Sequence, residues 1–213
     1  LNLAFNTSSQ AVPSINGTPV NLPAGDYYRV SGLAQISLAI PPITLSGNFV
    51  FEPWDTDANP ANGDEEVRVG VADLTFDFNV GGLDLLSVTN GSGAFVITDD
   101  GLAGVAAADV ALDVEALTLS GDFRVVVNTT NAPVTARDID VNGTTVRLSL
   151  DDATLVNLPV GPYLRVSGDD VDLDILGIGL SGSFTFEKKQ TADSDEVITV
   201  AAANVTFDLG SQA

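Results

Sequence analysis

Apolar and acidic side chains alternate along much of this chain, and this period of two restricts its fold more than any other feature. The clearest example is residues 109–115, where Val110, Leu112 and Val114 interleave with Asp109, Asp113 and Glu115. Residues 71–78 and 170–175 follow the same pattern. Successive side chains of a β-strand point to opposite faces, so the pattern predicts strands with one apolar and one acidic face. No stretch has the caps and spacing of an amphipathic helix.

The turn signals predict how these strands are connected. Pro, Gly, Asn and Asp cluster at intervals that leave strands of about 10 to 14 residues, longer than the usual five or six. All sequential neighbours can then be joined by short turns. We therefore expect an all-β chain, an elongated antiparallel meander curled over one apolar face and stacked like a solenoid. Two β-sandwich domains are the alternative.

Long internal repeats give this meander its organisation. The matching blocks occur in the same order and are Leu22–Gly32 with Leu158–Gly168, Ile43–Glu52 with Ile178–Glu187, and Glu66–Phe78 with Glu196–Leu209. An insertion near residues 145–157 accounts for the smaller offset of the upstream matches. The blocks predict a first repeat over 1–122, lacking its opening strand, and a second, truncated repeat over 123–213.

A Ser-Gly pair before a Phe recurs inside the long strands. The three copies are TLSGNFVFE at 44–52, TLSGDFRVV at 118–126 and GLSGSFTFE at 179–187. The pair predicts either a tight hairpin turn or a glycine bulge that bends a strand without ending it. We favour the bulge, because repeated bends at one height would curl the sheet over its apolar face.

The phenylalanines define the expected core. Their places in alternating strands predict that they are mostly buried together on one face; they are Phe49, Phe51, Phe76, Phe78, Phe123, Phe184, Phe186 and Phe207.

Composition excludes several functional classes. The chain has no Cys or His and a formal charge of −21, which rules out disulfides and Cys/His zinc sites and disfavours nucleic acid as a partner. There is no run of about 18 apolar residues, so no membrane span is expected. No Gly-x-Ser-x-Gly motif occurs, and the acids are scattered along every strand rather than paired for glycoside hydrolysis. We expect no enzyme activity.

One loop has the spacing of a calcium site. Asp55, Asp57, Asn59 and Glu66 occupy positions 1, 3, 5 and 12 of an oxygen-ligand loop, which predicts calcium as a cofactor. Position 6, however, is Pro60 rather than Gly, and the equivalent loop of the second repeat is much shorter. An ordinary solvated polar loop is the alternative. The same loop carries Trp54, the best candidate for an exposed aromatic residue.

The repeated phrase Leu-Ser-Gly-x-Phe-x-Phe-Glu, at 45–52 and 180–187, together with alternating acids and a Cys-free composition, resembles the tandem modules of very large secreted bacterial surface proteins. The resemblance implies an extracellular or cell-surface location and a structural role in a stalk, adhesin or filament, often with calcium. The competing interpretation is a module that binds carbohydrate or a surface through loops 53–65 and 145–157.

The ends of the chain fall inside repeats. We therefore expect strands 1–7 and 197–209 to pair with strands of neighbouring repeats or identical subunits, because unpaired N–H and C=O groups make a sheet edge adhesive.

Overall fold

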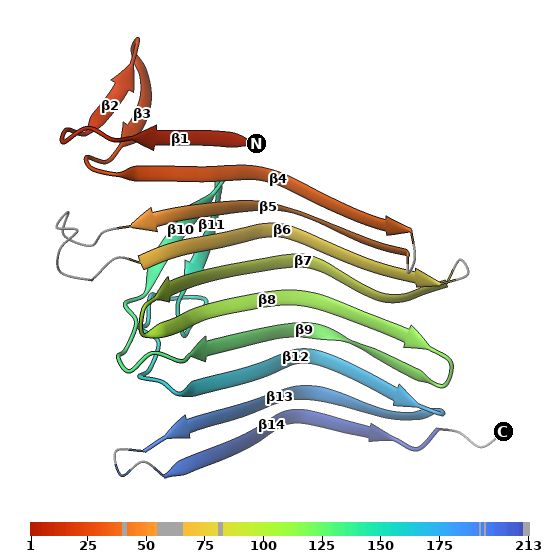
Figure 1. Ribbon diagram of the computed structural model, residues 1–213. Helices are drawn as coiled ribbons and strands as arrows, with labels where there is room; N and C mark the ends of the chain where they lie inside the picture. The colour runs from red at the N-terminus through yellow and green to blue at the C-terminus, as the bar shows by residue number, and fades with distance from the viewer. Residues whose placement is uncertain (40–41, 55–65, 81–82, 192, 194, 211–213) are drawn as a thin grey trace.

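The computed structural model describes residues 1–39, 42–54, 66–80, 83–191, 193 and 195–210, and within them the chain forms strands and no helix. Figure 1 shows one broad sheet with two small hairpins. The strands are β1 (Asn2–Asn6), β2 (Val12–Ile15), β3 (Thr18–Leu22), β4 (Tyr27–Ala39), β5 (Pro42–Trp54), β6 (Glu66–Val80), β7 (Leu83–Thr98), β8 (Gly101–Val114), β9 (Leu117–Asn128), β10 (Arg137–Val141), β11 (Thr144–Leu148), β12 (Tyr163–Ile175), β13 (Ile178–Gln190) and β14 (Glu196–Asp208).

The main sheet has ten strands in the order β1-β4-β5-β6-β7-β8-β9-β12-β13-β14, and each adjacent pair is antiparallel. The hairpin β2–β3 interrupts the meander after β1, and the hairpin β10–β11 interrupts it after β9. The sheet does not close into a barrel. The predicted all-β meander is thus confirmed. Both predicted repeats contribute to one sheet, and the boundary after Asp122 falls inside β9.

Bulges, rather than hairpin turns, explain the Ser-Gly phrase. Gly47 lies within β5 opposite the two residues Asp73 and Leu74 of β6, and Gly182 lies within β13 opposite Asn204 and Val205 of β14. The extra residue belongs to the neighbouring strand, and Asp73 and Asn204 take positive φ there, at 53° for both. A Cβ at Gly182 would lie 3.1 Å from the Cα of Val205, so the opposing bulge leaves room only for glycine.

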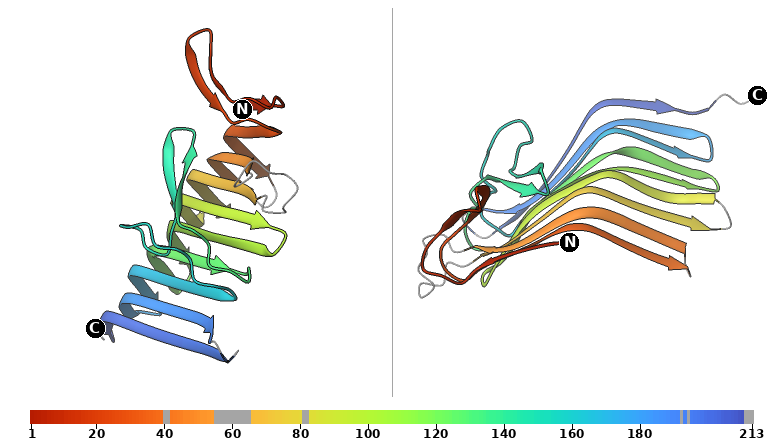
Figure 2. Two further views of the ribbon diagram at one scale, coloured as in Figure 1. Left: turned by 90° about the vertical axis from the view of Figure 1, so that its left-hand side faces the viewer. Right: turned by 90° about the horizontal axis from the view of Figure 1, so that it is seen from above.

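These bulges recur at similar heights, and the strands bend partway along their length (Figure 2). Asn90 of β7 and Asp170 of β12 also take positive φ at register shifts, at 52° and 49°. Asn and Asp tolerate this conformation better than other residues with a Cβ. Bulges at matching positions in neighbouring strands bend the sheet as a whole, as expected from the repeated Ser-Gly pairs.

The two faces of the sheet differ. We call the face that contacts β10–β11 the hairpin face. Its buried side chains form one cluster with the hairpin and the segment after it: Val50, Ala72, Ala94, Val96, Ala103, Val105, Val126 and Tyr163 from the sheet, and Ile139, Val141, Val146, Leu148 and Leu158 from the covering segment. Gly70 lets the hairpin approach closely, since a Cβ there would lie 2.5 Å from Val141 Cγ2.

We call the opposite side the apolar face, and it contains all eight phenylalanines of the expected core. The shared face confirms the predicted register, but the predicted burial is wrong. Phe51 is 37% exposed and Phe207 is 61% exposed, and the other six rings are only partly buried. The reason is that none of the described segments packs over this face. The alternation sets which side is apolar, and the covering layer lies on the other side.

None of the described residues form a helix long and apolar enough to cross a membrane.

Candidate functional site

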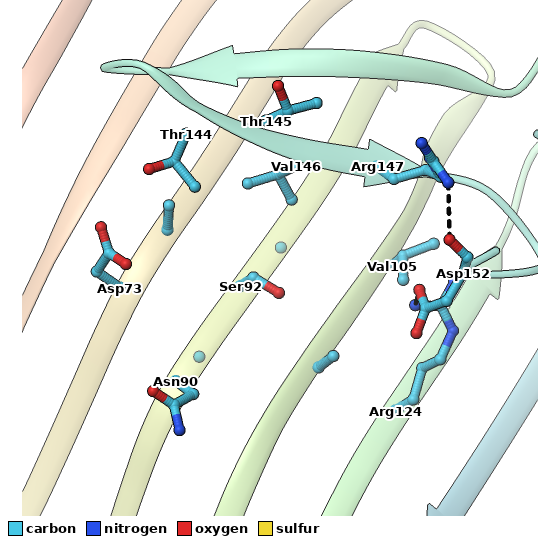
Figure 3. Close-up of a pocket in the computed structure, with 14 residues that line it drawn as sticks. Asp73, Asn90, Ser92, Val105, Arg124, Thr144, Thr145, Val146, Arg147 and Asp152 are labelled. Carbon is cyan, nitrogen blue, oxygen red and sulfur yellow. Dashed lines mark hydrogen bonds and ion pairs between the residues drawn. The ribbon is translucent and has the colours of Figure 1, made fainter.

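A cleft of about 520 Å³ lies on the hairpin face, between β11 and the sheet (Figure 3). Thr144, Thr145, Val146 and Arg147 line it from β11, Asp73 from β6, Asn90 and Ser92 from β7, Val105 from β8, Arg124 from β9, and Asp152 from the loop after β11. Ala72, Gly91, Gly93 and Ala107 complete the lining, so the cleft wall is about half polar and half apolar. Four adjacent strands of the main sheet, β6 to β9, contribute to its floor.

Two arginines hold the rim of this cleft. Arg124 donates from Nη1 to Asp152 Oδ1 at 2.5 Å and from Nη2 to the Ser149 carbonyl at 2.5 Å. Arg147 donates from Nε to Asp138 Oδ1 at 3.0 Å and from Nη1 to the Asp152 carbonyl at 2.7 Å. Burial lowers the pKa of Arg124, and Asp152 opposes that shift. Arg124 thus fastens the loop to the sheet, and Arg147 fastens it to the hairpin β10–β11.

The loop at 149–156 is also held by its own hydrogen bonds. Ser149, fully buried, donates from Oγ to the carbonyl of Thr154 at 2.8 Å and accepts from the N–H of Val156 at 2.8 Å. Asp151 accepts from the N–H groups of Ala153 and Thr154, and these hydrogen bonds lower its pKa. Asp151 therefore stabilises a turn of the loop, and Asp152, held by the two arginines, forms part of the cleft wall.

Of the four predicted calcium ligands, the structure describes only Glu66. Asp55, Asp57 and Asn59 lie outside the described residues. The Glu66 carboxylate is 7% exposed and bonds Arg68 Nε at 2.6 Å and Arg137 Nη1. A cation at Glu66 would have to compete with these two guanidinium groups. Among the described residues, no group of three or more acids is arranged to hold a metal ion.

Trp54 does not present a free platform. The Arg68 guanidinium carbon lies 3.9 Å from the centroid of its ring, and the residue is half-buried. This cation–π contact joins Trp54 to the Glu66 cluster. The expectation of an exposed aromatic in this loop is therefore wrong for the part of the loop that the structure describes.

A row of acidic side chains on adjacent strands lies on the part of the hairpin face that the hairpin does not cover. Asp122 of β9 pairs across the ladder with Asp109 of β8 and with Asp169 of β12. The negative charge of Asp109 raises the pKa of Asp122, with smaller contributions from desolvation and from Asp170 and Asp169. This acidic strip repels anions and gives the sheet its negative surface.

The same hydrogen-bond arrangement occurs in both repeats. Asn6 donates from Nδ2 to the carbonyls of Gln10 and Pro23 at 2.8 and 2.5 Å, and Asn128 donates to those of Ala132 and Pro159 at 2.8 and 2.7 Å. Their Oδ1 atoms accept from the N–H of Ser8 at 3.0 Å and of Thr130 at 2.9 Å. The Asn side chain ties the start of each hairpin segment to its end.

A second contact also repeats. The hydroxyl of Tyr27 donates to Glu52 Oε1 at 2.5 Å, and that of Tyr163 donates to Glu187 Oε2 at 2.9 Å. Both tyrosines are buried, at 9% and 3% exposure, and each lies at the first position of its long strand. The segment that leads into this long strand is therefore held by the same side-chain hydrogen bonds in both repeats.

Sequence reasoning missed the cleft and the packing of β10–β11. The available signal was the insertion near 145–157 together with Val141, Val146 and Leu148, an apolar set with no place in the main sheet. The arginines Arg124 and Arg147 carried no signal of their own. Comparison with known proteins adds nothing further: no family model, curated protein or solved structure matches this chain.

Proposed function

We propose that this chain is a non-catalytic structural repeat module of an extracellular surface protein, stalk or filament. The observation that carries the proposal is the agreement between the hydrogen bonds of Asn6 and those of Asn128, together with the Tyr27–Glu52 and Tyr163–Glu187 pairs. A unit whose connection is rebuilt atom for atom at the next repeat is suited to serial addition, because each repeat needs to contact only its neighbours.

The function on this proposal is mechanical. One sheet runs through both repeats, so a longer array adds strands at the same spacing and extends along a single axis. The acids of the hairpin face keep neighbouring arrays apart and attract cations loosely. The chain's net charge of −21 fits such an exterior.

The growth points are the two edges of the sheet. β1 pairs only with β4, and β14 pairs only with β13, among the described strands. β14 runs antiparallel to β13, and β1 antiparallel to β4, so a β1 strand from another repeat can continue the meander beside β14. Main-chain pairing of this kind is independent of side-chain identity and suits a polymer.

Particle size against concentration tests this proposal. Head-to-tail pairing through two different edges does not close, so the mean mass should rise steadily with concentration, and electron microscopy should show rods with a fixed axial repeat. A particle whose mass stays constant across the concentration range, with no rods, would contradict the proposal.

A proline scan of one edge provides the control. Successive N–H groups of a strand point alternately to its two sides, so of Ile198→Pro and Thr199→Pro, both on β14, one removes an N–H on the free side and the other an N–H that faces β13. The variant that loses the N–H on the free side should stop growth while the circular dichroism of the sheet is kept. The variant that loses the N–H facing β13 should instead lower the melting temperature.

Calcium stabilisation belongs to the same proposal and rests on the loop at 55–66. If the loop binds calcium, a chelator should lower the melting temperature, and Asp57→Ala should abolish that sensitivity. A melting temperature that does not respond to calcium or chelator would leave the polar-loop interpretation.

A carbohydrate- or surface-binding module is the second candidate, favoured by the polar side chains that line one part of the cleft, among them Thr144, Thr145 and Asp152. Neutral hydroxyls, amides and a carboxylate are suited to sugar hydroxyl groups. Binding on a glycan array that Asn90→Ala weakens would support this function. Binding that is absent, or unchanged in the variant, would remove it.

A further inference from the structure

The apolar face is continuous across the sheet and free of charge over most of it. Its ladder positions in three of the strands are Ile43, Leu45, Gly47, Phe49 and Phe51 in β5; Leu117, Leu119, Gly121, Phe123, Val125 and Val127 in β9; and Leu164, Val166, Gly168, Val171, Leu173 and Ile175 in β12. The first charged side chain toward the C-terminal edge is Lys188, near the end of β13. This continuous apolar surface extends over all the long strands, and it is larger than the apolar patches that soluble monomers usually leave exposed.

The surface is hollowed where the strands bend. A depression of about 250 Å³ is lined by apolar side chains of four strands, among them Leu119, Phe123, Val171, Phe184 and Val200. Its floor includes Gly168, and a Cβ there would lie 3.0 Å from the ring of Phe123. The sheet is bent toward this side, opposite β10–β11 (Figure 2). The apolar face is therefore a trough.

We infer that the trough packs face to face against the trough of a second copy of this chain, so that the two sheets enclose one apolar core. Bulges and glycines at the bends are what allow sheets to curve over a shared core. The relation is a two-fold, self-complementary interface, which closes at two copies.

The area of the face is sufficient for a stable pair. The nine long strands lie about 4.8 Å apart and span about 38 Å, and a strand of 12 residues is about 40 Å long, which gives roughly 1,500 Å² per copy. A stable interface needs about 800 Å² from each partner. Contact over slightly more than half of the trough is therefore enough to bury an area of that size.

The distribution of charge also favours a second copy. The acidic strip with Asp109, Asp122 and Asp169 lies on the hairpin face. Pairing through the apolar faces places both acidic strips on the outside of the assembly. The negative charges of the two chains, each with a net charge of −21, are then separated by the thickness of both sheets. Pairing through the hairpin faces would bring the acids together.

A charge-insertion experiment on adjacent residues tests this inference. Phe184 and Thr185 are neighbours on β13, both half-buried, and they point to the apolar and hairpin faces respectively. Burying an unpaired charge is costly, so Phe184→Glu should raise the dissociation constant of the pair by about tenfold or more, whereas Thr185→Glu should leave it unchanged. Sedimentation at several concentrations of the 213-residue chain measures both.

A second pair of variants guards against loss of folding. Val200 is 72% exposed on the apolar face of β14, and its neighbour Ala201 is exposed on the hairpin face. Val200→Glu should weaken the pair while the melting temperature of the single copy is kept, and Ala201→Glu should not weaken it. Stoichiometry separates this interface from the edges, because edge pairing continues beyond two copies. All of these measurements are therefore made in the proline variant that blocks the free edge of β14.

Three results would overturn the inference. They are a single copy at every concentration in the edge-blocked variant, a pair that neither glutamate on the apolar face weakens, or a single copy that native mass spectrometry finds carrying bound acyl chains. The last result would assign the trough to a lipid rather than to a second chain.

Discussion

The hairpin face is built twice from equivalent strands, and the two versions are buried very differently. β5 and β6 lie under β10–β11, whereas β13 and β14, which match them in sequence and register, lie under none of the described segments. Ala72 is 1% exposed, and Ala203, its equivalent one residue before the bulge, is exposed. The difference shows that local sequence fixes the strand and its bend, and that the covering hairpin fixes the burial.

The hairpin connections teach the same lesson from the other side. Leu158 is fully buried against the sheet, while Leu22, at the same place in the first repeat, is half-buried. Among the described strands, none lies beneath the hairpin β2–β3 in the position that β5–β8 hold beneath β10–β11 (Figure 1). The comparison predicts that matched substitutions in the two repeats have unequal effects.

The largest difference is expected at this leucine pair. Leu158→Ala removes a fully buried side chain and leaves a cavity, so it should lower the free energy of unfolding by about 2–5 kcal/mol. Leu22→Ala should cost clearly less, because that side chain is only half-buried in the folded state. Urea denaturation of both variants measures the difference. Equal losses would mean that the two hairpins are equally well packed.

The next effect concerns the glycine under the hairpin. Gly70→Ala places a Cβ 2.5 Å from Val141 Cγ2 and 2.9 Å from Val50 Cγ1, so overpacking should cost about 1–3 kcal/mol. The equivalent position in the second repeat is already Ala201, which is exposed. The reverse change, Ala201→Gly, should alter the unfolding free energy only slightly. An unchanged stability for Gly70→Ala would show that the hairpin is loosely held.

The tyrosine pair should sharpen the comparison by behaving alike in both repeats. Burial, and then the hydrogen bond and charge of Glu187, raise the pKa of Tyr163 to about 12, and burial and Glu52 raise that of Tyr27 as well. The folded state therefore holds these protons more tightly than the unfolded state, in which a tyrosine titrates near pH 10. Their contribution to stability is complete below pH 10 and is lost as the pH rises toward 12.

The measurement is unfolding free energy between pH 9 and pH 12 for the wild type and for Tyr27→Phe and Tyr163→Phe. Each variant should reduce the alkaline loss by a similar amount, because each tyrosine is buried by its own repeat. If only one of the two variants reduces the alkaline loss of stability, the burial of that tyrosine depends on the covering hairpin and not on the repeated unit.

The smallest effect concerns an arginine pair. Arg29 bonds the carbonyl of Asp140 at 2.8 Å and its Oδ1 at 3.0 Å, and thereby reaches the hairpin. Arg165 holds the equivalent place in β12, over which no described hairpin lies. Arg29→Ala should cost about 0–1 kcal/mol, because the ion pair lies at the surface with the Asp140 side chain 57% exposed, and Arg165→Ala should cost less. Thermal melts at low and high salt measure the difference, which salt should reduce.

The sequence predicts the sheet well because the relevant signals are local. Val110, Leu112 and Val114 alternate with acids, so β8 and its apolar side follow directly. The bulges were predictable from the Ser-Gly pairs. Their partners were not: the extra residue is Asp73 or Asn204 on the neighbouring strand, and only the register shows which acid or amide faces which glycine.

What lies over each face could not be predicted, because an apolar strand position does not specify its cover. Phe184 and Phe207 have the pattern of core residues yet line a trough. The actual core uses small residues such as Ala72, Ala94 and Ala103, which fit beneath a closely approaching hairpin and gave no signal alone. The cleft rim at Arg124 and Asp152 depends on the same packing.

Hydrogen exchange of β5 and β13 tests most directly whether cover, rather than strand sequence, sets local stability. β5 pairs with β4 and β6, and β13 pairs with β12 and β14, so both strands have a hydrogen-bonded neighbour on each side. Their amides therefore differ in whether a hairpin covers the strand, and not in how many strands they pair with. Mass spectrometry of the edge-blocked variant, diluted until it is a single copy, should find the amides around Val50 exchanging much more slowly than those around Thr185. Equal protection of the two strands would contradict the account.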